Sequence, residues 1–372
     1  NAGGYLRQQL DEWGNQHAHP DSWEPSRFAR RLPETVEVSI EGQSVAIGAW
    51  QYDVVGATGC SVPLILLDTD LEQNSTSHQE LTSWLYGGDD RYRLAQEIVL
   101  GIGGARMLRA LGHTGLTRFH LNEGHAALLI LELLREAERE RPGKWDFDKV
   151  RQQCVFTTHT PVAAGHDQFS YDLAQSVMGE PVPFEIIQML GGTDRLNMTR
   201  LALNASHYVN GVARKHGEVS REMFPDYPID SITNGIHSVT WTADSFQELY
   251  DQYIPGWRKD PFSLRCAISI PTHAIWKAHL KAKEQLIEEI QRQTEVSFDP
   301  DVLTIGFARR ATPYKRADLI LSDLNQLTTI AKEVGPLQLV FAGKAHPRDQ
   351  QGKDLICKIQ GAARRLQHQI RI

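Results

Sequence analysis

The chain has 372 residues, of which 41% are hydrophobic and 23% charged. This composition is typical of a folded globular protein of about two domains, and it excludes collagen, coiled coil and disorder. The net charge of −7 gives no overall attraction for nucleic acid or an anionic membrane surface, so we expect neither as a partner. No apolar run reaches the roughly 18 residues that a membrane-spanning helix needs.

The cysteines indicate the cellular compartment of the protein, and the two ends of the chain indicate whether it is part of a longer one. The four cysteines lie far apart and form no Cys-x-x-Cys pair. They are typical of reduced thiols, so we expect a cytoplasmic protein. The chain begins with Asn1 instead of Met and stops at Ile372, where an apolar strand pattern starts. We therefore expect an internal fragment of a longer protein.

Period-two alternation at residues 36–40 and 45–47, on either side of Gly42, predicts an antiparallel hairpin. The apolar run 62–67 predicts a buried strand. Residues 91–111 have helical spacing and contain a Gly-x-Gly-Gly stretch. Because no strand precedes these glycines, they predict close packing between helices and not a dinucleotide-binding turn.

The middle of the chain alternates strands with helices. Strands are predicted at 116–121 and 154–158, with a helix at 123–141 that ends at a Pro-Gly pair. Strand-then-helix alternation favours a parallel α/β sheet.

A second α/β unit follows a connector rich in Trp, Tyr, Asp and Pro at 241–261. Its expected elements are helices at 274–294 and 315–334 and strands at 302–307 and 337–341. We place the domains at 1–234 and 235–372, the second incomplete.

Ligands of open α/β sheets bind beyond the carboxyl ends of the strands. The first such loop contains Asn122, Glu123 and His125. It is explained either by a helix N-terminus, with Asn122 as cap and Glu123 in the first turn, or by a binding site. The His-Glu-x-x-His spacing of a zinc site is missing, so we predict no metal.

The second loop begins at His159, directly after a strand. This histidine is suited to bonding a sugar hydroxyl or sharing a proton, and a structural histidine bonded to a carbonyl explains it equally well. We expect His166 and Asp167 to cap the next helix.

The third loop carries Arg309, Arg310, Lys315 and Arg316 at the start of the predicted helix. Cations there oppose the helix dipole, so a phosphate site explains them better than solvated surface charge does. The fourth loop, with Gly343 and Lys344, lacks the spacing of a Walker loop. A phosphate site and solvated surface charge explain it equally well.

Taken together, these motifs resemble the α-glucan (glycogen, maltodextrin) phosphorylase family, in its bacterial and archaeal branch. The motifs, in the order of that family, are residues 120–125, Thr158-His159-Thr160, residues 206–213, Thr233-Asn234-Gly235-Ile236, Arg309-Arg310 with Tyr314-Lys315-Arg316, and Gly343-Lys344-Ala345. Residues 84–89 and 160–167 resemble that branch in particular.

The resemblance implies two Rossmann-like lobes of the GT-B glycosyltransferase type, the second incomplete here. It implies retaining phosphorolysis of terminal α-1,4-glucosidic bonds to glucose 1-phosphate, with α-glucan and inorganic phosphate as substrates. Pyridoxal phosphate is the implied cofactor, and its phosphate group donates and accepts a proton. Homo-oligomerisation is compatible with this interpretation.

The resemblance also implies roles for single residues. His159, Arg310 and Lys315 are the implied catalytic residues: His159 bonds the glucosyl unit, while Arg310 and Lys315 hold the attacking phosphate. The implied cofactor-binding residues are Arg309 and Lys315. The implied substrate-binding residues are Asn122, Glu123, His125 and Asn234.

The chain departs from the family pattern at both ends. The glycine-rich phosphate loop near the N-terminus is absent, and the lysine that carries pyridoxal phosphate lies beyond Ile372. We therefore expect the fragment itself to be inactive. Two alternatives remain: a nucleotide-sugar glucosyltransferase of the glycogen-synthase type, which has a similar Arg-x-x-x-x-Lys clamp, and a non-catalytic carbohydrate-binding module.

Overall fold

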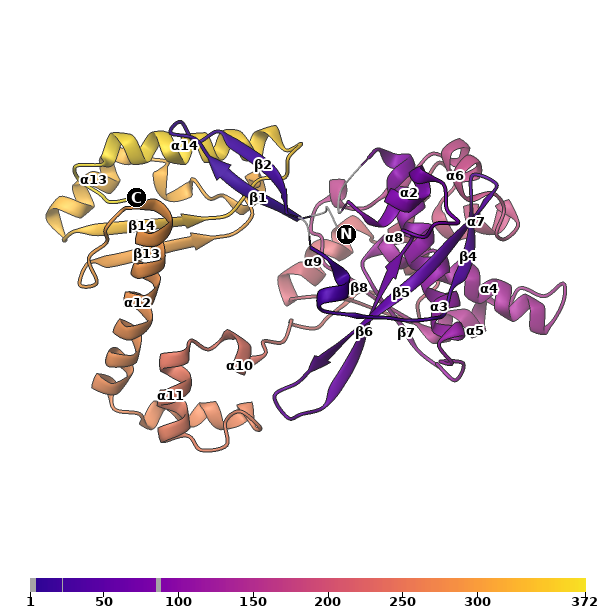
Figure 1. Cartoon of the computed structure of the whole chain (residues 1–372), viewed down its shortest axis with the longest axis horizontal. Helices are drawn as coiled ribbons and strands as arrows, with labels where there is room; N and C mark the ends of the chain where they lie inside the picture. The colour runs from indigo at the N-terminus through magenta and orange to yellow at the C-terminus, as the bar shows by residue number, and fades with distance from the viewer. Residues whose placement is uncertain (1–4, 22, 85–87) are drawn as a thin grey trace. The chain divides into compact units, whose positions relative to one another are not determined.

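A computed structural model describes residues 5–21, 23–84 and 88–372 (Figure 1). Residues 85–87, part of the stretch that we assign to the bacterial and archaeal branch, lie outside the described residues. The contacts divide the chain into two compact units. The first consists mainly of residues 23–235, and the second of residues 6–21 together with 236–372. Among the described helices, none is both long enough and apolar enough to cross a bilayer.

The first unit contains the predicted parallel sheet. Its strands lie in the order β12 (Asp230–Ser231), β11 (Tyr208–Gly211), β8 (Cys154–Thr158) and β7 (Phe119–Asn122), and each pair is parallel. Between β7 and β8 the chain forms α4 (Leu129–Glu140) and α5 (Phe147–Gln153). The predicted α/β architecture of this region is therefore confirmed.

Further helices connect the later strands of this sheet. They are α6 (Tyr171–Met178), α7 (Phe184–Gly191), α8 (Met198–Asn204) and α9 (Arg214–Met223), with the short antiparallel pair β9 (Gln168–Phe169) and β10 (Leu196–Asn197) among them. The apolar faces of the helices and strands form one continuous core, in which Phe156 is fully buried.

The helix predicted at 91–111 is present in three parts. It consists of α2 (Asp90–Ile98), a π-helical turn (Val99–Gly103) and α3 (Gly104–Ala110). A Cβ at Gly101 would lie 2.7 Å from the backbone nitrogen of Leu129. The prediction that these glycines serve close helix packing is confirmed.

The predicted hairpin is confirmed as β4 (Val36–Ile40) and β5 (Gln43–Val55), and the two-residue strand β3 (Arg30–Arg31) also pairs with β5. The prediction of a buried strand at 62–67 is wrong in its burial. Strand β6 (Ser61–Asp68) pairs with β5, but Val62 is 66% exposed and Leu64 47%. The reason is that the far part of this hairpin extends beyond the core (Figure 1). A short helix, α1 (Thr76–Gln79), follows.

In the second unit, the predicted strands are confirmed as the parallel pair β13 (Leu303–Ala308) and β14 (Leu337–Ala342), followed by α14 (Gln350–Leu366). The helix predicted at 315–334 is wrong in its first half, because α13 begins only at Leu324 and ends at Glu333. Two short 3-10 turns precede it, and Arg316 has a left-handed backbone (φ 53°) that a continuous α-helix excludes.

The predicted connector is helical. It contains α10 (Ser238–Trp241), α11 (Asp244–Tyr253) and a 3-10 segment (Pro261–Ser269), and it leads into the long helix α12 (Thr272–Thr294). Trp257 is 1% exposed and packs edge-on against Tyr250. This segment therefore has a small core of its own.

The N-terminal hairpin, β1 (Tyr5–Leu10) and β2 (Gln16–Asp21), lies against α14 in the second unit (Figure 1). The Arg364 guanidinium lies 4.5 Å from the Trp13 ring centroid, and Arg364 donates a hydrogen bond to the Glu12 carbonyl. The sequence analysis predicted no element in this segment.

Candidate functional site

Three parallel strands of the first unit end at one edge of the sheet. Asn122 is paired with Thr157, and Thr158 with Gly211, so the carboxyl ends of β7, β8 and β11 are level. His159 follows β8 directly and is half-buried. This edge is where an open α/β sheet binds ligands.

Glu123 holds the beginning of the His159 loop. Its side chain is buried, and Oε1 accepts hydrogen bonds from Thr158 Oγ1 at 3.1 Å, from the Thr160 backbone nitrogen at 3.0 Å and from the His159 backbone nitrogen. Glu123 has a left-handed backbone with φ 63°. Such a conformation costs energy in a non-glycine residue, and charge-assisted hydrogen bonds offset that cost.

The expectation that Glu123 lies in the first turn of a helix and complements its dipole is wrong. A 3-10 turn (Gly124–Ala126) follows Glu123, and α4 begins only at Leu129. The carboxylate instead bonds the neighbouring loop at residues 158–160. Asn122, the predicted cap, is exposed at the end of β7.

The loop is held through its backbone nitrogens. Within the described part of the chain, the His159 imidazole itself makes no hydrogen bond. The ring is therefore able to bond a ligand.

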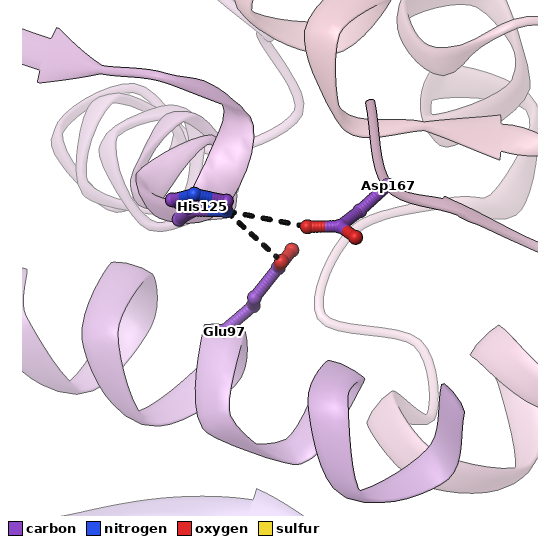
Figure 2. A group of neighbouring side chains, drawn as sticks. All are labelled: Glu97, His125 and Asp167. Carbon is purple, nitrogen blue, oxygen red and sulfur yellow. Dashed lines mark hydrogen bonds and ion pairs between the residues drawn. The ribbon is translucent and has the colours of Figure 1, made fainter. Parts of the chain in front are cut away.

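His125 belongs to an ionic cluster with Arg93, Glu97 and Asp167. Figure 2 shows His125 with Glu97 and Asp167. His125 Nδ1 lies 3.2 Å from Asp167 Oδ2 and 3.7 Å from Glu97 Oε1. Arg93 Nη2 lies 3.0 Å from Asp167 Oδ2. The expectation that Asp167 caps the next helix is wrong, because Ser170 caps α6.

The cluster shifts the pKa values of its members. The bond to Asp167, together with the interaction with Glu97, raises the pKa of His125 to about 9. Burial raises the pKa of Glu97 to about 8. Burial also works to raise the pKa of Asp167, but its bonds with His125 and Glu97 and the charge of Arg93 hold it well below the usual range. His125 therefore favours the charged form at neutral pH, and Glu97 the neutral one.

The same residues have the spacing of a metal-ligand set. One ligand atom from each of Glu97, His125 and Asp167 lies within 4.8 Å of the others. The Arg93 guanidinium, however, already bonds Asp167 and lies 3.2 Å from Glu97 Oε1. A metal ion at this place has to compete with an arginine for its ligands.

His166 also differs from its predicted capping role. It is 7% exposed, its Nδ1 lies 2.9 Å from Thr199 Oγ1, and its ring packs edge-on against Phe224. It is a buried histidine that ties the His159 loop to α8.

His216, which the sequence analysis missed, lies at the same edge of the sheet. It is in the first turn of α9, and its Nδ1 lies 3.4 Å from the Val212 nitrogen. Its Nε2 is buried and has no hydrogen-bond partner among the described residues, and burial lowers its pKa. The available signal was a histidine three residues after the motif at 206–213.

Asn234 lies near the end of the first unit. Its side chain is exposed, and its backbone nitrogen donates to the Val212 carbonyl at 3.1 Å. Asn234 therefore lies near the same edge of the sheet. It comes two residues after Ile232, whose backbone nitrogen donates to the Gly211 carbonyl.

The cationic loop belongs to the second unit. Arg309 and Arg310 are exposed, Lys315 is half-buried, and none of them forms an ion pair with a described carboxylate. The prediction that they lie at a helix N-terminus is wrong, because Pro313–Lys315 is a 3-10 turn. Thr312 Oγ1 is buried in this loop without a hydrogen-bond partner among the described residues.

The third and fourth loops lie side by side. The Arg309 nitrogen donates to the Ala342 carbonyl at 3.0 Å, and the Ala311 nitrogen to the Lys344 carbonyl at 3.1 Å. Gly343 has φ 151°, and a Cβ there would lie 2.0 Å from the Arg309 carbonyl oxygen. Only glycine allows this approach.

The N-terminal hairpin supports the fourth loop. The Gln16 side chain donates to the Ala345 carbonyl and accepts from the Ala345 nitrogen, each at 2.9 Å. No local sequence pattern predicts this contact.

Comparison with known proteins gives one consistent family. A model of the carbohydrate phosphorylase family matches residues 184–372. A maltodextrin phosphorylase of Thermococcus litoralis is 36% identical over 96% of this chain and 47% of its own length. Glycogen phosphorylases of Mycobacterium bovis (35%, 99% of this chain, 49% of its own) and Aquifex aeolicus (34%, 87% and 51%) are also similar. The chain spans about half the length of these relatives.

Proposed function

The chain belongs to the carbohydrate phosphorylase family, and on this premise we propose that it is part of an α-glucan phosphorylase. The reaction is phosphorolysis of terminal α-1,4-glucosidic bonds in maltodextrin or glycogen, with retention, to give glucose 1-phosphate. The observation that carries the proposal is the His159 loop, which Glu123 fixes at the carboxyl edge of the parallel sheet.

In this proposal His159 hydrogen-bonds the terminal glucosyl unit. Its half-buried, unbonded imidazole on a fixed backbone supports that role. Glu123 supports the pocket from behind, Asn122 and His125 line it, and Asn234 bonds sugar hydroxyls where the chain leaves the first unit. Preorganised polar groups of this kind favour the transition state because they need no reorganisation during the reaction.

Arg310 and Lys315 hold the attacking phosphate. Their positive charges are not used by described carboxylates, which supports an anion as their partner. Phosphate binding by guanidinium and ammonium groups is charge-assisted, and it places the nucleophile.

The residues of the cationic loop fit a second phosphate group, that of pyridoxal phosphate. The buried, unpartnered Thr312 Oγ1 is the observation that supports the fit. Arg309 and Lys315 are the residues that would hold the cofactor phosphate. When bound, the cofactor supplies a phosphate group that donates and accepts a proton; the chain's own cations keep two phosphate groups close despite their like charge.

The proposed architecture has two Rossmann-like lobes of the GT-B type, with a boundary between residues 234 and 235 and the second lobe incomplete. The parallel sheets of both units support it. We further propose a cytoplasmic location, supported by four cysteines far apart in the sequence, and no nucleic-acid or membrane partner, supported by the negative net charge. Homo-oligomerisation is compatible with this architecture.

The test measures glucose 1-phosphate release from maltoheptaose, with and without inorganic phosphate and with pyridoxal phosphate added. The complete protein that contains this chain is expected to release it only with phosphate, and the 372-residue chain to release none. Glucosyl transfer from a nucleotide sugar without phosphate would instead identify a synthase-type enzyme. Glucan binding without turnover in the complete protein would identify a binding module.

A further inference from the structure

The loop that carries His159 runs from the end of β8 to the start of β9. Its first residues are held by Glu123, whose Oε1 accepts from Thr158 Oγ1 and from the Thr160 nitrogen. A loop held at one end alone is able to open locally, so contacts at its other end limit how far the residues after Thr160 move.

Asp167 forms that other end, and it is bound through both its backbone and its side chain. Its carbonyl accepts from the Met198 nitrogen at 3.1 Å. Its Oδ2 accepts from Arg93 Nη2 at 3.0 Å and Nε at 3.2 Å, and it lies 3.2 Å from His125 Nδ1. The carboxylate is 29% exposed, so the contact is not deeply buried.

One turn of the chain provides a contact to each end of the loop. Glu123 and His125 flank Gly124, and the first bonds the start of the loop while the second bonds its end. Gly124 is packed closely, since a Cβ there would lie 3.1 Å from Met198 Cβ. This closely packed turn therefore holds both ends of the loop.

Arg93 lies in α2 and bonds Asp167, so it connects the end of the loop to this helix. Figure 2 shows Glu97, His125 and Asp167 converging from a helix, a turn and a loop. Glu97 is 1% exposed, and its Oε1 lies 3.2 Å from Arg93 Nε and 3.7 Å from His125 Nδ1. Burying such a group costs stability, and a protein retains that cost mainly where position matters.

We propose that Arg93 and Asp167 are positioning residues for His159, acting through the far end of its loop. The guanidinium holds the Asp167 carboxylate, and Glu123 holds residues 158–160, so the loop that carries His159 is held at both ends. The role of the positioned group rests on the proposed function, in which His159 bonds the glucosyl unit.

The experiment compares Asp167→Asn with Glu136→Gln in the 372-residue chain. The Arg109–Glu136 ion pair is a matched control at 2.9 Å, with side chains 24% and 26% exposed, against 24% and 29% for Arg93 and Asp167. Amide hydrogen exchange is measured for the peptides that cover residues 159–166. We expect exchange about tenfold faster in Asp167→Asn and unchanged in Glu136→Gln.

Arg93→Lys and Arg93→Met provide the second comparison, because lysine retains the charge. Exchange at 159–166 is expected to rise less in Arg93→Lys than in Arg93→Met, while exchange in α4 stays at the wild-type rate in both. Unchanged exchange in Asp167→Asn and Arg93→Met would overturn the proposal. Equal acceleration across the whole first unit would also overturn it, because that result describes a general loss of stability.

Maltoheptaose affinity, measured by calorimetry on the same variants, separates this proposal from the proposed function. Weaker binding in Asp167→Asn, to a degree that approaches His159→Ala, supports both. Wild-type affinity in His159→Ala would contradict the sugar-binding role of His159, and with it the positioning role. Weaker binding in His159→Ala with wild-type affinity in Asp167→Asn would overturn the positioning role alone.

Discussion

The side-chain amide of Gln16 bonds both the carbonyl and the nitrogen of Ala345, a residue 329 positions later. These two bonds give Ala345 the backbone pairing that a neighbouring strand would otherwise provide. The N-terminal hairpin and the loop of Gly343 and Lys344 are thereby joined within the second unit.

Gln16→Leu is expected to loosen both segments. Three hydrogen bonds are lost, two with Ala345 and one from Gln8 Nε2, and the Ala345 backbone groups keep no replacement, a loss of about 1–3 kcal/mol. Amide exchange should therefore accelerate in residues 6–21 and 343–346. Gln350→Leu is the control, since that exposed glutamine bonds its helix neighbour Asp354 and no other residue in the described part of the chain. Equal effects of the two changes would show that the Gln16 contact is unimportant.

Gly343→Ala is expected to destabilise the second unit strongly. A Cβ there would lie 2.0 Å from the Arg309 carbonyl oxygen, so the loop of Arg309 and Arg310 has to move. The expected loss in the free energy of unfolding is about 2–4 kcal/mol from overpacking and backbone strain. Urea unfolding measures it.

Gly335→Ala is the matched control for that change. Gly335 has a similar φ of 147°, but nothing lies within 4 Å of its added Cβ. The difference between the two variants is therefore the steric contact with Arg309. Similar losses in both would show that backbone strain alone is responsible.

Several of the strands could be predicted from sequence because their signals are local. Alternation and apolar runs identify β7, β8, β13 and β14, and the rule for strand ends identifies the loops that follow. The same signals misled at 62–67, where apolar residues lie on a hairpin that extends beyond the core, and at 315–323, where a left-handed Arg316 prevents a helix.

The contacts that hold the candidate site could not be predicted in this way. Arg93 and Asp167 are 74 residues apart, and no periodicity links them. Glu123 was identified as a site residue, but its action on residues 158–160 depends on a positive φ that a glutamate rarely adopts. Such pairings become visible only when the chain is folded.

Arg310→Ala is expected to lower phosphorolysis by the complete enzyme and to leave glucan binding unchanged. Removing one anchored contact to the attacking phosphate costs about 2–4 kcal/mol in the transition state, or roughly 30- to 1000-fold in kcat/KM. Initial rates of glucose 1-phosphate formation at varied phosphate measure the effect. Arg365→Ala, an exposed arginine on α14, is the control. Wild-type kinetics in Arg310→Ala would refute the assignment of the phosphate site.

The cluster of Arg93, Glu97, His125 and Asp167 predicts a stability that falls as pH rises above mildly acidic values. Folding raises the pKa of His125 from 6.5 to about 9 and that of Glu97 from 4.5 to about 8. In both cases the folded chain binds the proton more tightly, so the stabilisation is complete below the unfolded pKa and is lost towards the folded one. Folding lowers the pKa of Asp167, so its contribution to stability is lost as the pH falls, and this loss occurs only in acid.

Urea unfolding of the first unit between pH 5 and 9.5 measures this dependence. Glu97→Gln fixes a neutral side chain of the same shape, so it should remove the part of the decline that falls between about pH 4.5 and 8. The part due to His125, above about pH 6.5, should persist in that variant in reduced form, because Asp167 still raises the pKa of His125, and it should disappear in His125→Gln. Glu136→Gln, at an ion pair of similar exposure, is expected to keep the full wild-type slope. An unaltered slope in both cluster variants would show that protons on Glu97 and His125 are not what couples the stability of this unit to pH.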